Sequence, residues 1–149
     1  QYPAERAALA AGQAVIAFGV AQVRERSNGG LAATVERIAL MGVTDWYIPV
    51  ESSHERELAQ YLEASGRCFT KPLRHDATEP VHPDFILTDT RAPVALEVYG
   101  MATPAYLARK AEKQALYAER MPGQHWQWEA LNESLESAVR RLPPPVRWA

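Results

Sequence analysis

Strand-like apolar stretches flank a turn signal near the start of the chain. β-branched and aromatic side chains, which favour strands, are frequent in the first stretch: Val15, Ile16, Phe18, Val20 and Val23. Asn28-Gly29 follows and is typical of a tight hairpin turn. The pattern predicts a β-hairpin with strands near 13–26 and 31–41. Two helices are the alternative, because positions 31, 35, 38 and 41 also fit one helical face.

Helix signals lie on both sides of this hairpin. Residues 2–12 are rich in alanine and predict a short helix. Further along, Ser52 and Glu55 have the spacing of a capping box, which predicts a helix from Ser53 to Ala64. Gly66 suits the end of that helix.

The remaining elements are read from apolar runs and their proline and glycine boundaries. Three strands are expected at 68–70, 85–87 and 94–99, followed by a helix over 104–120 with Pro104 in its first turn. Trp126 and Trp128 alternate with polar residues and predict a fourth strand, and Asn132 is the expected cap of a last helix. We expect an antiparallel meander of three strands, then a helical crossover to the fourth.

Composition and charge narrow the picture. The chain has 149 residues, of which 47% are hydrophobic and 23% charged, the values of an ordinary folded domain. The net charge of −2 gives no strong field toward nucleic acid or membrane, so polyanion binding needs a local basic patch. Cys68 is the one cysteine, which indicates a reducing, cytoplasmic location. We expect its thiol to be buried as a small apolar group.

The expected fold class is α/β (α+β), with a central mixed four-stranded sheet flanked by helices. Residues 1–50 are expected to form an N-terminal extension packed on a core of residues 51–149, giving one globular domain. The first residue is Gln1 rather than Met, so we expect a piece of a longer protein. The longest uncharged run, from Ala7 to Val23, contains glutamines and glycines and is short for a membrane span. No membrane association is expected.

Two carboxylates fall on neighbouring predicted strands. Asp84 follows Pro83 at the start of one, and Glu97 lies in the middle of the next. Because side chains alternate along a strand, Glu97 and Tyr99 share the face opposite the apolar residues of that strand. A buried carboxylate needs a partner, and two carboxylates on adjacent strands can chelate a hard cation such as Mg²⁺.

The helix over 104–120 carries the matching groups. Tyr106, Lys110, Lys113 and Tyr117 have the spacing of one helical stripe. Two lysines and two tyrosines on one face are suited to phosphate binding. Glu55 lies on the inward face of its own helix, and it is either the acid of the capping box or a third metal contact.

At this point the sequence resembles a known superfamily. His82-Pro83-Asp84-Phe85-Ile86-Leu87 and then Leu96-Glu97-Val98-Tyr99-Gly100 resemble the motifs of PD-(D/E)XK nucleases, which have the restriction-endonuclease-like fold. The resemblance covers about residues 51–131, and the expected order of helices and strands is similar to that fold's core. It implies that Asp84, Glu97 and, from the first helix, Glu55 bind divalent metal, Mg²⁺ or Mn²⁺.

One position departs from the superfamily pattern. The motif lysine is expected two residues after Glu97, where Tyr99 stands. Some members instead carry the lysine on the following helix between tyrosines. By that resemblance the catalytic lysine is Lys113, with Lys110 as the alternative.

The resemblance implies an Mg²⁺-dependent deoxyribonuclease, a module of a larger DNA-processing or mobile-element protein. DNA is the expected partner, together with a homodimer mate or a partner domain. The expected substrate contacts are Lys71, Arg74, Tyr99, Tyr106, Arg109 and Tyr117. The alternative is a catalytically inactive nuclease-like domain that binds nucleic acid or a protein.

Overall fold

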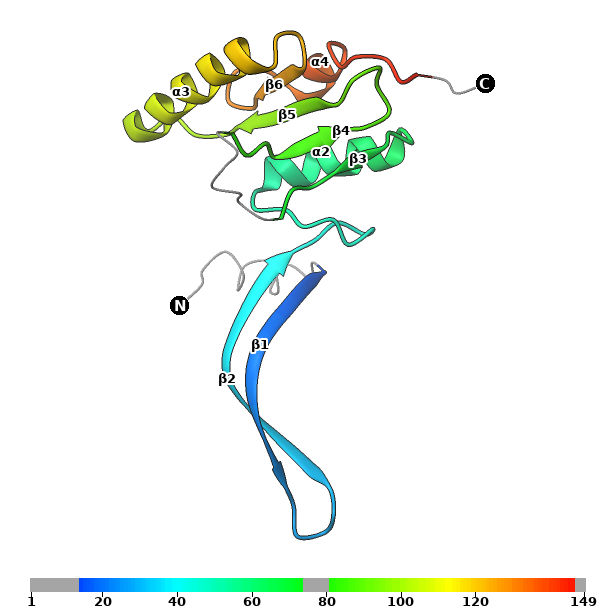
Figure 1. The fold of residues 1–149 in the computed structure, drawn as a ribbon, viewed down its shortest axis with the longest axis vertical. Coiled ribbons are helices and arrows are strands. Elements are labelled where there is room, and N and C mark those ends of the chain that lie inside the picture. The colour runs from blue at the N-terminus through cyan, green and yellow to red at the C-terminus, as the bar shows by residue number, and fades with distance from the viewer. Residues whose placement is uncertain (1–13, 74–80, 147–149) are drawn as a thin grey trace. The chain divides into compact units, whose positions relative to one another are not determined.

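The computed structural model describes residues 14–73 and 81–146. It divides the chain into two compact units, Gln1–Glu51 and Ser52–Ala149, drawn together in Figure 1. Each unit is described by itself. The short helix expected over residues 2–12 lies outside the described residues.

The first unit contains a long β-hairpin. Strands β1 (Val15–Glu25) and β2 (Leu31–Gly42) pair antiparallel over their whole length, with a bulge between Val20 and Ala21. Gly29 takes a φ of 77° in the connecting turn, a conformation open to glycine. The predicted hairpin is therefore confirmed, and the two-helix alternative is wrong for this segment.

The second unit is a four-stranded sheet with helices on both faces. The strand order is β3 (Phe69–Thr70), β4 (Phe85–Leu87), β5 (Val94–Tyr99) and β6 (His125–Glu129). The first three strands form an antiparallel meander, and β5 and β6 are parallel. Helix α3 (Pro104–Arg120) makes the crossover between β5 and β6. The mixed sheet and this connectivity match the expectation from sequence.

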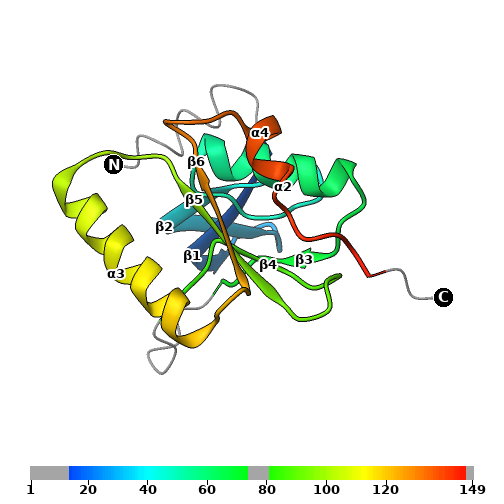
Figure 2. The same cartoon turned by 90° about the horizontal axis from the view of Figure 1, so that it is seen from above.

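The two faces of the sheet meet different helices. Trp126 Nε1 donates to Ala138 O of α4 (Leu135–Val139), and Trp128 packs edge-on against His54 of α2 (Ser53–Ala64). The alternate residues of β6 turn toward α3, since Gln127 accepts a hydrogen bond from Gln114. Figure 2 shows α3 on one side of the strands and α2 with α4 on the other.

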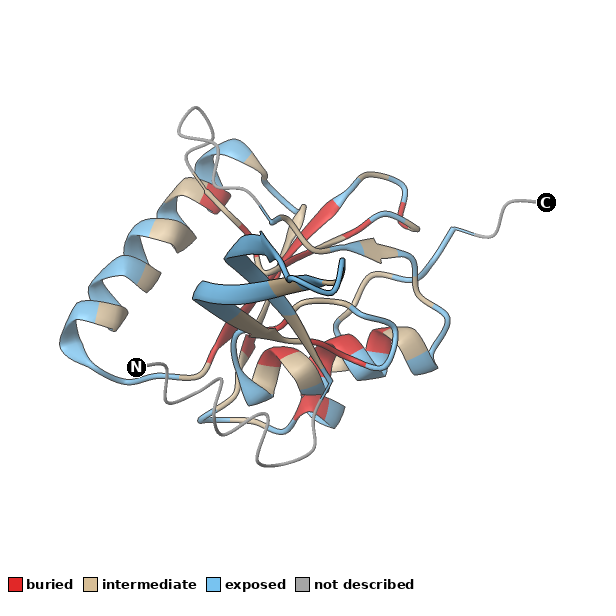
Figure 3. Ribbon diagram, turned by 90° about the horizontal axis from the view of Figure 1, so that it is seen from below, coloured by how far each residue is buried: buried red, intermediate tan, exposed pale blue. Residues whose placement is uncertain are grey.

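The core of this unit lies between the sheet and α2 with α4. Its fully buried apolar side chains include Leu58, Leu62, Phe85, Leu87 and Leu96. In Figure 3 buried residues gather on the sheet and on one side of α2, whereas β1 and β2 are exposed or intermediate. None of the described helices is long and apolar enough to cross a membrane.

Two local expectations were wrong. Ser134 caps α4, where Asn132 was expected; the Asn132 N–H instead donates to Glu129 O in the turn after β6. Cys68 is exposed rather than buried. It precedes β3, a strand of two residues at the edge of the sheet, where little packs against a side chain.

Candidate active site

Glu97 is the centre of a buried polar cluster between β5 and α3. Its side chain is 2% exposed. Lys113 Nζ lies 2.8 Å from both carboxylate oxygens and donates a further hydrogen bond to His82 O at 3.0 Å. The Tyr117 hydroxyl donates to Glu97 Oε1 at 2.6 Å. One buried carboxylate is thus held by a cation and a phenol from one helix.

The N-terminal residues of α3 fix where this helix begins. Thr103 caps α3 by accepting from Tyr106 N, and Pro104 occupies the first turn. The stripe predicted from sequence faces the sheet, so Lys113 and Tyr117, one turn apart, both reach Glu97. Burial and then the hydrogen bond to Glu97 raise the pKa of Tyr117, which keeps its hydroxyl a neutral donor.

Asp84 directly precedes β4 and lies beside β5. Phe85 pairs with Leu96, and the Asp84 N–H also donates to Leu96 O at 3.1 Å. Asp84 Oδ2 accepts from Val98 N at 2.7 Å. Burial, and then the negative charge of Glu97, raise the pKa of the Asp84 carboxyl to about 7. Among the described residues no lysine, arginine or histidine forms an ion pair with it.

Glu55, a buried carboxylate in the first turn of α2, adds to Asp84 and Glu97. Its N–H donates to Ser52 Oγ at 3.0 Å, so the capping interaction is present. Its Oε2 also accepts from Lys71 Nζ at 2.8 Å, and Lys71 lies 4.9 Å from the centre of the Phe85 ring. The charge of Glu55 contributes to the raised pKa of Asp84. Glu55 therefore combines the cap with a negative charge that acts on Asp84.

A second cluster lies at the carboxyl ends of β5 and β6. Lys110 forms an ion pair with Glu129, and its Nζ is 4.8 Å from the centre of the Tyr99 ring. Tyr106 packs edge-on against Tyr99 and donates to Val98 O at 3.4 Å. Lys110 and Lys113 thus serve different carboxylates on different strands, and Lys113 is the one at Glu97.

One of the expected substrate contacts, Arg109, is not in these clusters. Arg109 is exposed on α3, and no ion pair to it is found among the described residues. Arg74 lies outside the described residues.

The carboxylates allow a test of metal binding. In the described part of the chain, no three His, Cys, Asp or Glu side chains are grouped closely enough to hold a metal ion. Mg²⁺ does not need three such side chains, because it is commonly bound by one or two carboxylates together with waters and substrate phosphate. Asp84 and Glu97 supply the hard oxygen ligands, and burial and then the charge of Glu97 raise the pKa of Asp84. The two residues fit such an ion. Glu97 would then contact both the metal ion and Lys113, whose Nζ lies beside both of its oxygens.

Sequence reasoning missed one contributor. His125, at the start of β6, stacks on Tyr117 with ring centres 4.2 Å apart and planes within 6°. The position of His125 could have been predicted from the alternation along β6. His125 and Gln127 face away from Trp126 and Trp128, toward α3.

Comparisons with known proteins give one match. The model of a family described as a protein of unknown function (DUF1173) matches residues 4–131. Searches of curated proteins and of solved structures give no match. Because the family match spans more than half of the chain, the protein belongs to the DUF1173 family.

Proposed function

We propose that residues 52–149 form a metal-dependent nuclease domain that hydrolyses phosphodiester bonds in DNA, as a module of a larger DNA-processing or mobile-element protein. The observation that carries the proposal is the arrangement of Asp84 and Glu97. Asp84 directly precedes β4, Glu97 lies on the adjacent strand β5, and Glu97 is held by Lys113 and Tyr117 from the crossover helix. This set combines metal-binding oxygens with a positioned cation.

The order of elements supports the proposal. A helix, three antiparallel strands, a crossover helix and a parallel strand follow one another from α2 to β6. That is the order the resemblance to the restriction-endonuclease-like core led us to expect. The choice of DNA as substrate rests on the same resemblance.

Asp84 and Glu97 would hold Mg²⁺ or Mn²⁺, and Glu55 would add negative charge beside them. A bound divalent ion supplies Lewis-acid stabilisation of phosphate charge and a more acidic water. The chain's own contribution is to keep the two carboxylates fixed: Val98 N–H orients Asp84, and Tyr117 orients Glu97. A pre-set site avoids reorganisation during the reaction.

Lys113 is the proposed catalytic lysine. Its Nζ is the cation nearest to Glu97, whereas Lys110 is engaged with Glu129. Its side chain is 32% exposed, so it reaches both the carboxylate and the solvent side where a phosphate would approach. There it would orient the attacking water or stabilise charge on the phosphate. Lys110, about one turn before Lys113, and Tyr106, about two turns before it, would contact backbone phosphates.

Cleavage of DNA tests the proposal. Supercoiled plasmid and labelled single- and double-stranded oligonucleotides are incubated with the protein in Mg²⁺, in Mn²⁺ and in EDTA. We expect cleavage with metal, none in EDTA, and none by Asp84→Ala. Cleavage that persists in EDTA, or in a folded Asp84→Ala variant, contradicts the proposed site.

A catalytically inactive domain that binds nucleic acid or a protein is the second candidate. The observation in its favour is that Lys113 contacts both oxygens of Glu97, as a permanent counter-ion would. Calorimetry with Mn²⁺ and a bound non-cleavable oligonucleotide separates the two functions. Metal binding lost in Asp84→Asn supports the nuclease, and absence of metal binding supports the inactive domain.

A further inference from the structure

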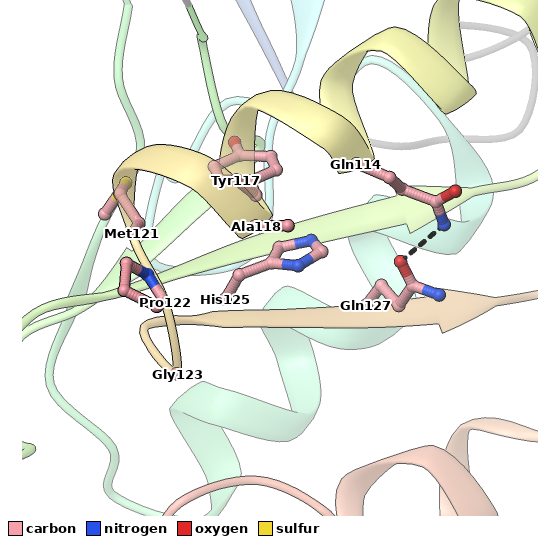
Figure 4. A pocket seen from close by; sticks show the side chains of 8 residues that line it. All are labelled: Gln114, Tyr117, Ala118, Met121, Pro122, Gly123, His125 and Gln127. Atoms are coloured by element: carbon pink, nitrogen blue, oxygen red, sulfur yellow. Dashed lines mark hydrogen bonds between the residues drawn. The ribbon is translucent and has the colours of Figure 1, made fainter.

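A pocket of about 210 Å³ lies between the end of α3 and the start of β6. Figure 4 shows its lining, with His125 and Gln127 on β6 facing Gln114 and Tyr117 on α3. Pockets that bind drug-sized ligands have volumes of roughly 300–1,000 Å³, so this smaller pocket has room for a single ring system.

The pocket contains a flat aromatic surface. The His125 ring stacks in parallel on Tyr117, at 4.2 Å between ring centres, and it also lines the pocket. Tyr117 is fully buried and so provides a fixed support beneath His125. Aromatic and histidine side chains of this kind are stacking platforms for unpaired bases.

The polar groups of the pocket are uncharged hydrogen-bonding groups. The lining includes no lysine, arginine, aspartate or glutamate. Gln114 donates to Gln127 at 2.7 Å, and Gln127 Nε2 donates to Glu129 Oε1 at 3.3 Å, so two side-chain amides lie at the pocket. His125 Nε2 is buried and has no hydrogen-bond partner among the described residues. Burial, and then the charge of Lys113, lower the pKa of His125, which favours its neutral form. A neutral planar ring suits this lining better than a phosphate.

The pocket adjoins the candidate active site through one residue. Tyr117 supports His125 with its ring and donates to Glu97 with its hydroxyl. We propose that the His125 pocket binds an unpaired nucleobase of the substrate strand, next to the phosphate that Lys113 would contact beside Glu97. This inference rests on the proposed nuclease function and extends it to a substrate with at least one unstacked nucleotide.

A fluorescent base tests the pocket without relying on cleavage. Single-stranded oligonucleotides carrying one 2-aminopurine, moved along the strand, are titrated with the protein in EDTA. Stacking on His125 should quench the emission at one position. His125→Ala should weaken binding about 5- to 150-fold, the effect of losing one stacked base. His125→Phe keeps an aromatic ring, so it should restore both the quenching and the binding affinity.

An abasic site at the quenched position is the matched control. It should bind wild type and His125→Ala equally, because no base is left to stack. If DNA is bound and cleaved but neither His125→Ala nor the abasic site changes binding, the pocket proposal is wrong and the nuclease stands. If no DNA is cleaved, the protein is titrated with dAMP and the NMR signals of His125 are followed. If those signals shift although no DNA is cleaved, the pocket proposal stands and the nuclease proposal is contradicted. If the signals do not shift and no DNA is bound, both proposals are contradicted.

Discussion

Asp84 and Glu97 are adjacent carboxylates in different electrostatic situations. Glu97 has the Lys113 ammonium and the Tyr117 hydroxyl on its oxygens, whereas Asp84 has one backbone N–H. Burying a charge without a partner is costly, and the cost appears as a raised pKa. The sequence indicated both acids, but which of the two lysines reaches Glu97 depends on how α3 lies across the sheet. This packing of α3 on the sheet is tertiary structure, which the spacing of residues along the helix alone does not predict.

The pKa of Asp84 predicts how stability depends on pH. Its value of about 7 in the folded protein lies above the ordinary 3.8. Between these values the folded state keeps a proton that the unfolded chain has lost, so stability falls as pH rises from about 4 to 7. Asp84→Asn removes this penalty. Its advantage over wild type, measured by urea unfolding in EDTA, should grow by on the order of 4 kcal/mol across that interval and stay constant above it.

Asp89→Asn is the matched control for that series. Hydrogen bonds from Arg67 lower the pKa of Asp89, so its contribution has the opposite sign. This variant should be less stable than wild type at neutral pH, and the difference should shrink on acidification. If the Asp84→Asn difference is the same at every pH, the raised pKa of Asp84 is contradicted.

Tyr117→Phe isolates the hydroxyl that holds Glu97. The ring should stay stacked on His125, and only the 2.6 Å hydrogen bond to a charged group is lost. Such bonds contribute about 1.5–3 kcal/mol, so the free energy of unfolding should fall by about that amount. Tyr106→Phe, which loses a 3.4 Å contact to Val98 O, should have a smaller effect. Equal effects of the two substitutions would show that the Tyr117 hydroxyl does not fix Glu97.

At the scale of elements, local signals located most helices and strands. Asn28-Gly29, the pair Ser52 and Glu55, and Pro104 each act within a few residues of their own turn or helix. The cap of α4 was misjudged because Asn132 and Ser134 are equally good capping residues. The choice between them is made by the turn that follows β6, where Asn132 is engaged with Glu129.

A close approach between α2 and the end of β5 makes a further prediction. A Cβ added at Gly100 would lie 2.6 Å from Cδ2 of His54, whose ring packs edge-on against Trp128. Gly100→Ala should therefore destabilise the protein by about 1–3 kcal/mol, the usual cost of overpacking. In chemical denaturation the double variant Gly100→Ala/His54→Ala should be less destabilised than the sum of the single variants. Strict additivity would contradict this contact.

At the scale of the whole chain, the sequence predicted the order of elements and the sheet of the second unit. It did so because a crossover helix between two strands leaves few arrangements for the sheet. It did not predict the Tyr117–His125 stack or the Lys110–Glu129 pair. These join residues that are distant in sequence, and each type of side chain has many other possible partners.

The most direct test of the proposed function is the rate of DNA cleavage by Glu97→Gln in Mg²⁺. Glutamine keeps the size of the side chain but removes the negative charge that would hold the metal and Lys113. We predict a fall of about 10²–10³-fold or more relative to wild type, with the fold intact by circular dichroism. Glu136→Gln, an exposed acid on α4, should cleave at the wild-type rate. Wild-type cleavage by Glu97→Gln would contradict the account.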